Sequence, residues 1–381
     1  MMDRPIYLDN FSTTSLSPYA LSEMTQALSM TGNASSPHVA GARALARIND
    51  AREKVADLIG ALPVEIFFTS GATEANNLVL RGMACWAKAN EPRRRRIIIS
   101  AIEHKSVLET ALSLTSLGFE VVQAPVRRDG LVDPELLSTL VDGQTLLVSL
   151  MHVNNETGIV QPIGAAVDIA HGHGALFHCD AAQAVGKLPV DVLELGVDYL
   201  SLSAHKCHGP MGIGALYIAA DAPKPFTQNI GGGQERGVRS GTEPVPLIVG
   251  FGAAAAEARH RLPRDAVHSA QLVTRFLAGL DARHVRYHRV SIGVSTIPGG
   301  ITLIFPGVCA DELVNMVSRE LCISTGSACN RGSVQPSYVF TSMGFSKDEA
   351  NNIIRFSFSR FNTFEDADGA AMILAQAIET V

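Results

Sequence analysis

Between residues 64 and 218, short apolar runs alternate with segments of helical periodicity. This alternation predicts an α/β fold in which a mostly parallel, doubly wound sheet carries helices on both faces. Such a sheet binds ligands at the carboxyl ends of its strands, so polar residues that follow a strand are candidates for a site. The expected strands are Ile66–Thr69, Ile97–Ser100, Glu120–Ala124, Leu146–His152, Ala175–Cys179, Tyr199–Ser203 and Ile213–Ile218.

The C-terminal part of the chain has a different pattern. Two helical segments, Pro246–His260 and Ala266–Leu280, are followed by strands and helices in mixed order. This order predicts a smaller α+β domain beside the large one. Its expected elements are strands at Ile301–Phe305 and Ile353–Ser359 and helices at Ala310–Leu321 and Glu365–Thr380.

One expected strand ends in Ser-Ala-His-Lys, residues 203–206. Burial and nearby cations lower the pKa of a lysine amine and make it a nucleophile that can form a Schiff base with a carbonyl. Asp180 ends another strand, one strand–helix–strand unit upstream. Pyridoxal phosphate needs such a pair: a lysine for its aldehyde and an acid that keeps its ring nitrogen protonated. A surface lysine and a helix N-cap aspartate are the simpler alternatives.

Two further segments carry chemistry. Residues 67–77 place small and hydroxyl-bearing residues between a strand and a helix that is expected from Ala72 to Lys88, and backbone N–H groups at such a helix start bind phosphate. A simple capped helix start is the alternative. Cys329 lies among small and polar residues that indicate an exposed loop, where a cysteine is poorly explained as core filler. Arg331 would favour its thiolate.

Composition excludes several classes of protein. The 381 residues are 46% hydrophobic with a net charge of -6, enough for a large core and without the basic footprint of direct nucleic-acid binding. No segment is apolar enough to span a membrane, and the N-terminus lacks a signal-peptide pattern, so we expect a cytoplasmic protein. The six cysteines have no metal-ligand spacing, so we expect no metal site. Five of them are expected to be buried free thiols: Cys85, Cys179, Cys207, Cys309 and Cys322.

Taken together, these motifs resemble a cysteine desulfurase of the fold-type I, class V aminotransferase-like group of pyridoxal phosphate enzymes, in its long-loop form. The resemblance runs nearly end to end. It implies a large cofactor-binding domain at residues 16–262 and a small domain at residues 1–15 and 263–381 that carries the cysteine loop. The matching segments are 7–10, 13–14, 32–38, 69–74, 103–105, 152–158, 231–236, 239–242, the Cys329 loop and 354–357.

The resemblance implies a role for each residue of the cofactor site. Lys206 would bind the aldehyde of pyridoxal 5'-phosphate and later move protons, Asp180 would pair with the ring nitrogen, and His104 would stack on the ring and move protons. A helix-capping role is the alternative for His104. Gln183 would donate to the phenolic oxygen of the cofactor. The phosphate would be bound by Ala72, Thr73, Ser203, His205 and, from a partner subunit in a homodimer, Thr242.

The resemblance also implies the reaction. Asn155 would lie close to the phenolic oxygen of the cofactor and to the carboxylate of L-cysteine. Arg355 would bind that carboxylate, since bidentate geometry favours arginine, with Arg360 as the more structural alternative. Cys329 would attack the sulfur of the bound substrate, release L-alanine and pass the persulfide sulfur to an acceptor protein. The candidate pathways are iron–sulfur assembly, tRNA thiolation and DNA phosphorothioation. A selenocysteine lyase, another class V enzyme or a non-catalytic scaffold are the alternatives.

Some positions depart from the family pattern. Phe11-Ser12 stands where small residues are usual, Ala204 replaces a frequent glycine, and Cys207-His208 and Met211 replace an apolar–aromatic pair and a basic residue. Asn330, Arg331 and Gly332 replace a run of small hydroxyl residues. No departure removes a chemical group that the reaction needs, so we expect a specialised branch with its own acceptor surface.

Overall fold

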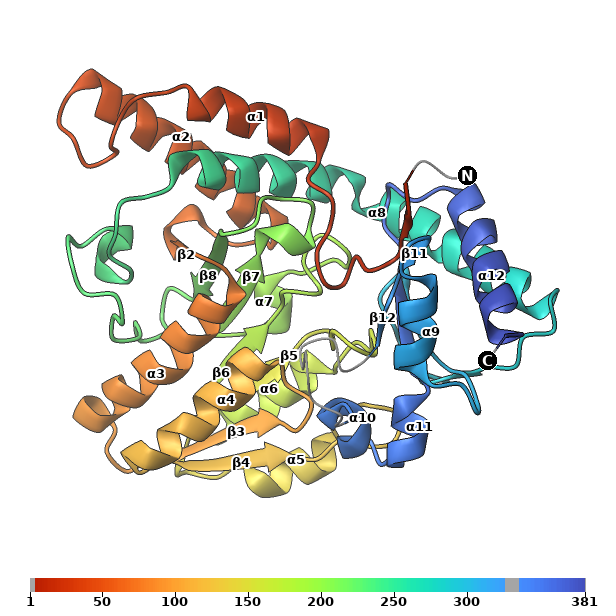
Figure 1. Cartoon of the computed structure of the whole chain (residues 1–381). Helices are drawn as coiled ribbons and strands as arrows, with labels where there is room; N and C mark the ends of the chain where they lie inside the picture. The colour runs from red at the N-terminus through yellow and green to blue at the C-terminus, as the bar shows by residue number, and fades with distance from the viewer. Residues whose placement is uncertain (1–3, 326–335, 381) are drawn as a thin grey trace.

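The computed structural model describes residues 4–325 and 336–380, and its centre is a seven-stranded sheet (Figure 1). The strand order is β2-β8-β7-β6-β5-β3-β4. The pairs from β4 to β7 are parallel, and β8 runs antiparallel to both of its neighbours. The predicted mostly parallel sheet is confirmed. Its strands are β2 (Ile66–Thr69), β3 (Arg96–Ser100), β4 (Glu120–Ala124), β5 (Thr145–Met151), β6 (Leu176–Asp180), β7 (Tyr199–Ser203) and β8 (Gly214–Ile218).

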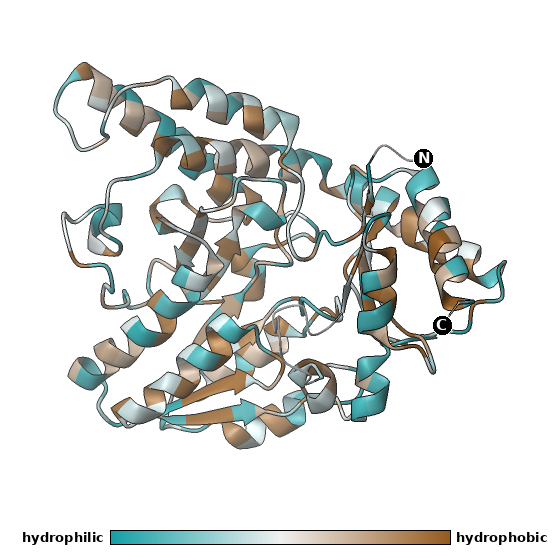
Figure 2. Ribbon diagram, viewed as in Figure 1, coloured by the Kyte–Doolittle hydropathy of each residue, from teal (hydrophilic) through white to brown (hydrophobic). Residues whose placement is uncertain are grey.

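Helices cover both faces of this sheet. Successive strand residues point to opposite faces, and Phe67 and Phe68 accordingly belong to two different core clusters. In Figure 2 the strands are mainly hydrophobic, whereas the helices have both hydrophobic and hydrophilic sides. The sheet is therefore buried on both sides, as doubly wound sheets are. Its helices are α1 (Pro18–Leu28), α2 (Val39–Leu58), α3 (Ala72–Asn90), α4 (Lys105–Ser113), α5 (Pro134–Leu140), α6 (Ile163–Gly172) and α7 (Val192–Leu195).

The C-terminal part builds a second core around a four-stranded antiparallel sheet of order β12-β13-β10-β9. The N-terminal segment joins it, because β1 (Ile6–Tyr7) pairs in parallel with β11 (Leu321–Cys322). We propose that the two cores mark the two expected domains. The remaining elements are β9 (His288–Arg289), β10 (Gly300–Ile304), β12 (Ser324–Thr325), β13 (Ile353–Ser357), α9 (Ala310–Val317), α10 (Tyr338–Ser342), α11 (Lys347–Asn351) and α12 (Phe364–Ile378).

One expectation about the helices is wrong. The two helices expected on either side of Pro263 form one 37-residue helix, α8 (Val245–Asp281). The gap between the two expected helices contains Pro263, and proline removes one helical hydrogen bond and disfavours a helix interior. Packing outweighs that cost, because Phe251 is buried in the large-domain core and Phe276 in the small-domain core. The expected domain boundary at residues 262 and 263 therefore falls inside α8.

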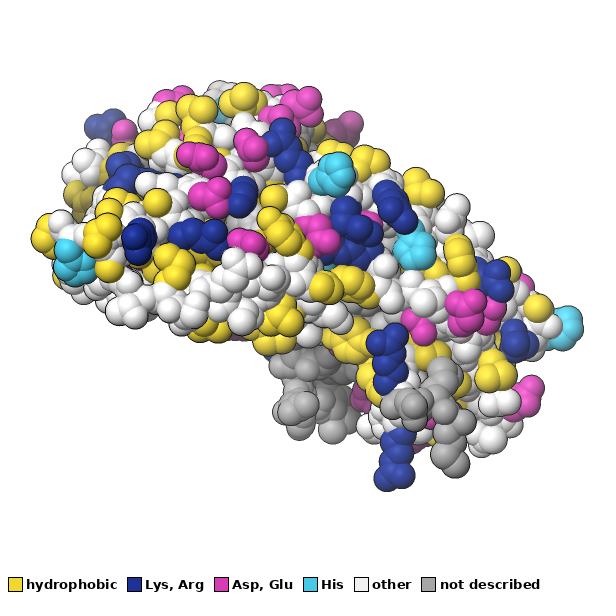
Figure 3. Space-filling model, turned by 90° about the horizontal axis from the view of Figure 1, so that it is seen from above, with side chains coloured by type: hydrophobic (Ala, Val, Ile, Leu, Met, Phe, Trp, Pro, Cys, Tyr) yellow, Lys and Arg dark blue, Asp and Glu magenta, His cyan; other side chains and the backbone are white. Residues whose placement is uncertain are grey.

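The outer face of the α1, α2 and α8 layer mixes apolar and charged side chains (Figure 3). Leu28 and Val39 are among the exposed apolar residues of α1 and α2. No helix in the described ranges is both long enough and apolar enough to cross a membrane.

Candidate active site

A cavity of about 610 Å³ lies at the carboxyl ends of the parallel strands. That volume is typical of a pocket for a small organic ligand. Thr242 is exposed and does not belong to the cavity lining, and Cys329 lies outside the described residues. The structure brings the other predicted site residues together here: Ala72, Thr73, His104, Asn155, Asp180, Gln183, Ser203, His205, Lys206 and Arg355.

Lys206 ends a short 3₁₀ turn directly after β7. All five residues of β7 are buried, so the strand fixes the point at which the lysine reaches the cavity. Its Nζ donates to the backbone carbonyls of Phe11, at 2.5 Å, and Ser12, at 2.7 Å. The amine is thus held at the cavity wall by the N-terminal segment.

Asp180 is the last residue of β6 and is buried. Its Oδ1 accepts from the backbone N–H of Ala182 at 2.9 Å, and its Oδ2 accepts from Asn76 Nδ2 at 2.8 Å. The carboxylate therefore supports the turn that follows β6 and also lines the cavity, so the two interpretations of this residue are compatible.

His104 is the N-cap of α4, and its Nδ1 accepts from the backbone N–H of Ser106 at 3.1 Å. Burial lowers the pKa of His104, and Lys206 and Lys105 lower it further, against an opposing effect of Asp180. The ring therefore favours its neutral form at neutral pH. The His104 side chain therefore caps α4 and also lines the cavity, as the Asp180 side chain supports a turn and lines the cavity.

The start of α3 forms an anion cradle. Gly71 is its N-cap, with φ of 153°, and no side chain caps the helix, so the expected alternative of a capped start is wrong. The backbone of β8 packs against this turn, because a Cβ on Gly214 would lie 2.6 Å from Gly71 Cα. The free N–H groups of a helix start bind phosphate. Ser203 and His205 line the same cavity, so these residues fit the phosphate of the expected cofactor.

Arg355, on β13, lies across the cavity from the sheet and is 4% exposed. Its Nη2 donates to Asp9 Oδ1 at 2.7 Å and Ser12 Oγ at 2.8 Å, and its Nη1 donates to the carbonyl of Asn155 at 2.7 Å. Within the described part of the chain, Arg355 Nε and Asn155 Oδ1 are buried without a hydrogen-bond partner. A bound molecule that offers an acceptor to Arg355 Nε and a donor to Asn155 Oδ1 would satisfy both atoms.

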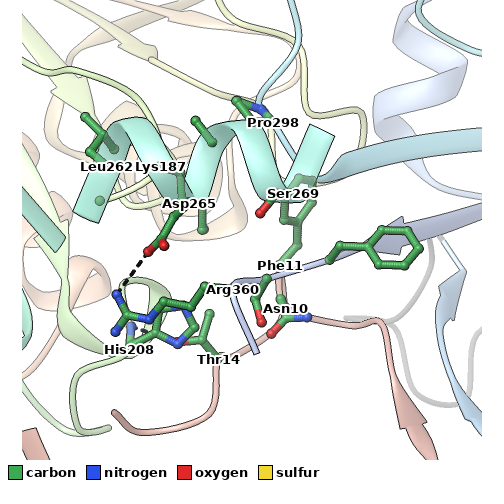
Figure 4. Close-up of a pocket in the computed structure, with 14 residues that line it drawn as sticks. Asn10, Phe11, Thr14, Lys187, His208, Leu262, Asp265, Ser269, Pro298 and Arg360 are labelled. Atoms are coloured by element: carbon green, nitrogen blue, oxygen red, sulfur yellow. Dashed lines mark hydrogen bonds and ion pairs between the residues drawn. The ribbon is translucent and has the colours of Figure 1, made fainter. Parts of the chain in front are cut away.

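Arg360 does not line this cavity and instead lines a smaller one, which Figure 4 shows. It donates to Glu257 Oε2 at 2.8 Å and to Asp265 Oδ2 at 3.2 Å. Both carboxylates belong to α8, so Arg360 connects the end of β13 to that helix. The cavity beside it has a volume of only about 30 Å³.

Gln183 is held by two neighbours. Its Nε2 donates to the carbonyl of Phe11 at 2.7 Å, and its Oε1 accepts from Lys187 Nζ at 2.9 Å. Burial and the nearby Lys206 lower the pKa of Lys187 to about 7. The Phe11 carbonyl thus accepts from both Gln183 and Lys206. Phe11 replaces the small residue that is usual in the family, and these two contacts use its backbone and not its side chain.

Sequence reasoning missed Asp9, Asn76, Ser106 and Glu156 as parts of this site. Burial raises the pKa of Glu156 to about 7, although it accepts a hydrogen bond of 2.6 Å from Ser337 Oγ and lies near Arg355. Asp9 and Glu156 stand in segments that match the family pattern, which was the one available signal. Two of the cysteines expected to be buried, Cys179 and Cys207, are buried, whereas Cys85, Cys309 and Cys322 are partly exposed.

A family model described as "Aminotransferase class-V" matches residues 6–369. The chain is 41% identical to "Cysteine desulfurase IscS" of Pseudomonas entomophila, over 99% of this chain and 93% of that protein, and 40% identical to the IscS of Pseudomonas putida KT2440 over the same shares.

Solved structures agree with the sequence matches. One described as "NIFS-LIKE PROTEIN" has a TM-score of 0.91 and 37% identity, covering 99% of this chain and all of that chain. Another, "SspA in complex with cysteine", has a TM-score of 0.82 and 38% identity, covering 94% and 99%. The resemblance stated from sequence is confirmed: the chain belongs to the class-V aminotransferase family of pyridoxal phosphate enzymes and, within it, to the cysteine desulfurases.

Proposed function

We propose that the chain is a homodimeric, cytoplasmic enzyme that converts L-cysteine to L-alanine and carries the released sulfur on Cys329. The observation that supports this best is the single cavity that Lys206, Asp180, His104 and Arg355 share. A scaffold without catalysis has no use for a nucleophilic amine, an acid, a neutral imidazole and a guanidinium around one space of this size.

The residues fit pyridoxal 5'-phosphate in three respects. The uncapped start of α3 suits a phosphate, Asp180 suits a protonated ring nitrogen, and Lys206 is within reach of the same cavity. Bound there, the cofactor withdraws electrons from the substrate carbon atoms. Lys206 would hold the aldehyde through its Nζ and would later move a proton, and the neutral imidazole of His104 would accept or donate a second proton.

Arg355 is proposed to bind the substrate carboxylate. Its Nε is a buried donor without a partner in the described ranges, and a carboxylate oxygen is an acceptor that would pair with it. Asp9 and Ser12 hold the guanidinium in place, so little side-chain freedom is lost when the substrate binds.

Cys329 is proposed to take the sulfur. Its thiolate would form a bond to the substrate sulfur while the bond from that sulfur to the substrate carbon breaks. The electron pair of the broken bond would stay with the substrate, whose carbon would take up a proton, so the products are alanine and one persulfide on the enzyme. The described flanks of its segment lie beside the cavity: Ser324 pairs with Arg355 in the small sheet, and Ser337 donates to Glu156. The persulfide would then pass to an acceptor protein in iron–sulfur assembly, tRNA thiolation or DNA phosphorothioation.

The homodimer proposal is based on Thr242. Thr242 is exposed and ends the segment 231–242, which the resemblance assigns to the phosphate site of a partner subunit. Inactive Lys206→Ala subunits mixed with inactive Thr242→Ala subunits should regain activity in heterodimers, whereas a fully active monomer would contradict the proposal.

Incubation with L-cysteine tests the function directly. Alanine should form, and mass spectrometry should find one added sulfur atom on Cys329. Lys206→Ala should lose both products. Cys329→Ser should retain the cofactor and lose sulfur transfer, while the matched variant Cys322→Ser, at a partly exposed cysteine, should remain active. A persulfide on Cys322 together with an active Cys329→Ser variant would refute the assignment. Faster turnover of selenocysteine would favour the selenocysteine lyase.

A further inference from the structure

A buried amide contacts two polar groups that line the cavity, Asp180 and Ser106. Asn76 lies on the inner side of α3 and is fully buried. Its Nδ2 donates to Asp180 Oδ2 at 2.8 Å and to Ser106 Oγ at 2.8 Å. An amide nitrogen carries two hydrogens, so both are used.

The orientation of this amide is set by Asp180. Turning the group over would place its oxygen against the carboxylate, where two acceptors repel each other. The orientation has a cost, because Asn76 Oδ1 is buried without a hydrogen-bond partner among the described residues. An amide that served only to fill the core would satisfy its acceptor as well, and an unpaired buried atom calls for a functional explanation.

The chain of contacts continues to His104. A backbone N–H can only donate, so the bond from Ser106 N to His104 Nδ1 means that Nδ1 carries no hydrogen. The Ser106 hydroxyl lies 2.8 Å from the same nitrogen. Since its oxygen already accepts from Asn76, its hydrogen is available for Nδ1, and the ring hydrogen of neutral His104 is left on Nε2.

We propose that Asn76 is a positioning residue that couples Asp180 to His104 through the Ser106 hydroxyl. This inference rests on the proposed roles of His104 and Asp180 in the cofactor site. Both donated bonds leave the same amide nitrogen, so donation to the Asp180 carboxylate weakens the second N–H bond to Ser106 Oγ and, through it, the donation from Ser106 to Nδ1. A change in the hydrogen bonding of Asp180 should therefore change the hydrogen bonding of His104 Nδ1.

A double-mutant cycle at Asn76 and Ser106 tests whether the two residues act on His104 together or each only supports the fold. Asn76→Leu removes both donors at similar volume, Ser106→Ala removes the hydroxyl, and Ser106→Thr keeps it. Asn90→Leu is the matched control, because Asn90 is an exposed asparagine of the same helix that donates to a backbone carbonyl. Asn76→Ala is prepared in parallel, so the test stands if the leucine variant does not fold.

The main readout is the ¹⁵N resonance of His104 Nδ1 in protein labelled at its histidine rings, assigned by its absence in His104→Gln. Asn76→Leu and Ser106→Ala should each move this resonance, whereas Ser106→Thr and Asn90→Leu should not. In the Ser106→Ala background, adding Asn76→Leu should move it no further. Additive shifts, or no shift in Asn76→Leu, would overturn the proposal.

Two readouts on the cofactor-loaded enzyme complete the test. Asn76→Leu should shift the visible absorption of the bound cofactor because Asp180 loses a donor, and Ser106→Ala should not. Both should lower kcat by about 10- to 100-fold with little change in KM, the size of loss seen when the hydrogen-bond partner behind a metal-bound histidine is removed. Failure of the proposed function would leave the wild type without this absorption, but the resonance cycle would still be readable.

Discussion

Arg355 and Arg360 lie close together in sequence. The side chains of both are buried, bound to carboxylates and left with an unpaired Nε in the described part of the chain. The difference between them is the space that each one faces. Arg355 lines a cavity of about 610 Å³, whereas the cavity beside Arg360 measures about 30 Å³, which holds roughly one water molecule. Burial and ion pairing therefore do not distinguish an arginine that binds substrate from a structural one. The volume of the cavity beside the arginine distinguishes them.

The largest effect is expected on the structural side of this comparison. Arg360→Met leaves Glu257 and Asp265 without their buried partner, and breaking such a pair costs about 3–5 kcal/mol. Urea denaturation should show this loss, while turnover per folded, cofactor-loaded subunit stays close to the wild type. Arg259→Met, which breaks an exposed pair with Asp57, is the control and should cost less than about 1 kcal/mol. Normal stability with lost turnover would place Arg360 in the substrate site instead.

On the binding side, Arg355→Lys should lower kcat/KM for L-cysteine by about 100-fold. A lysine cannot reproduce the fork that contacts Asp9, Ser12 and Asn155, and disrupting a buried charged pair costs about 2–5 kcal/mol, where each 1.4 kcal/mol is tenfold. Steady-state alanine production measures the effect. The visible absorption of the bound cofactor should persist, and an unchanged KM would mean that another group binds the carboxylate.

Glu156, which lies near Arg355, adds a prediction about how the stability of the protein depends on pH. Burial raises its pKa from 4.5 to about 7, against the lowering effects of Ser337, Arg355 and Lys105. The folded protein keeps this proton where the unfolded chain has lost it, so stability falls as pH rises between these two values.

Between pH 5 and 6.5, the free energy of unfolding of the wild type should fall by about 2 kcal/mol relative to Glu156→Gln, whose amide does not titrate. Urea denaturation of both proteins at several pH values measures this difference. Parallel pH profiles would show that Glu156 keeps an ordinary pKa.

The smallest effect is expected for Ser12→Ala. The hydroxyl accepts one of several hydrogen bonds from Arg355, and Asp9 and Asn155 still hold the guanidinium after its loss. One hydrogen bond contributes about 0.5–1.5 kcal/mol, so kcat/KM for L-cysteine should fall about 2- to 10-fold. A loss as large as that of Arg355→Lys would mean that Ser12 contacts the substrate itself.

Local patterns were enough to predict the large sheet. Its seven strands lie within about one residue of the expected ranges, because apolar runs bounded by polar residues correspond to strands buried on both faces. α8 was mispredicted because a proline weakens a helix locally, while the packing that restores it comes from residues far away in sequence.

The cavity residues were predictable where they end strands, since strand ends gather at one edge of a sheet. Asn76 and Ser106 could not be predicted in this way. They lie in the first turns of two helices, and only the packing of α3 against α4 brings the amide and the hydroxyl together. Asp9 was missed for a similar reason, because its partner Arg355 is distant in sequence.

The continuous helix α8 has a consequence for how the molecule unfolds. Ile248 and Phe251 belong to one core and Leu272 and Phe276 to the other, yet all four lie on the same helix. Helix formation is cooperative along its length. Loss of either core would therefore weaken the helix that supports the second one, and the two halves of the subunit should melt together in one calorimetric transition.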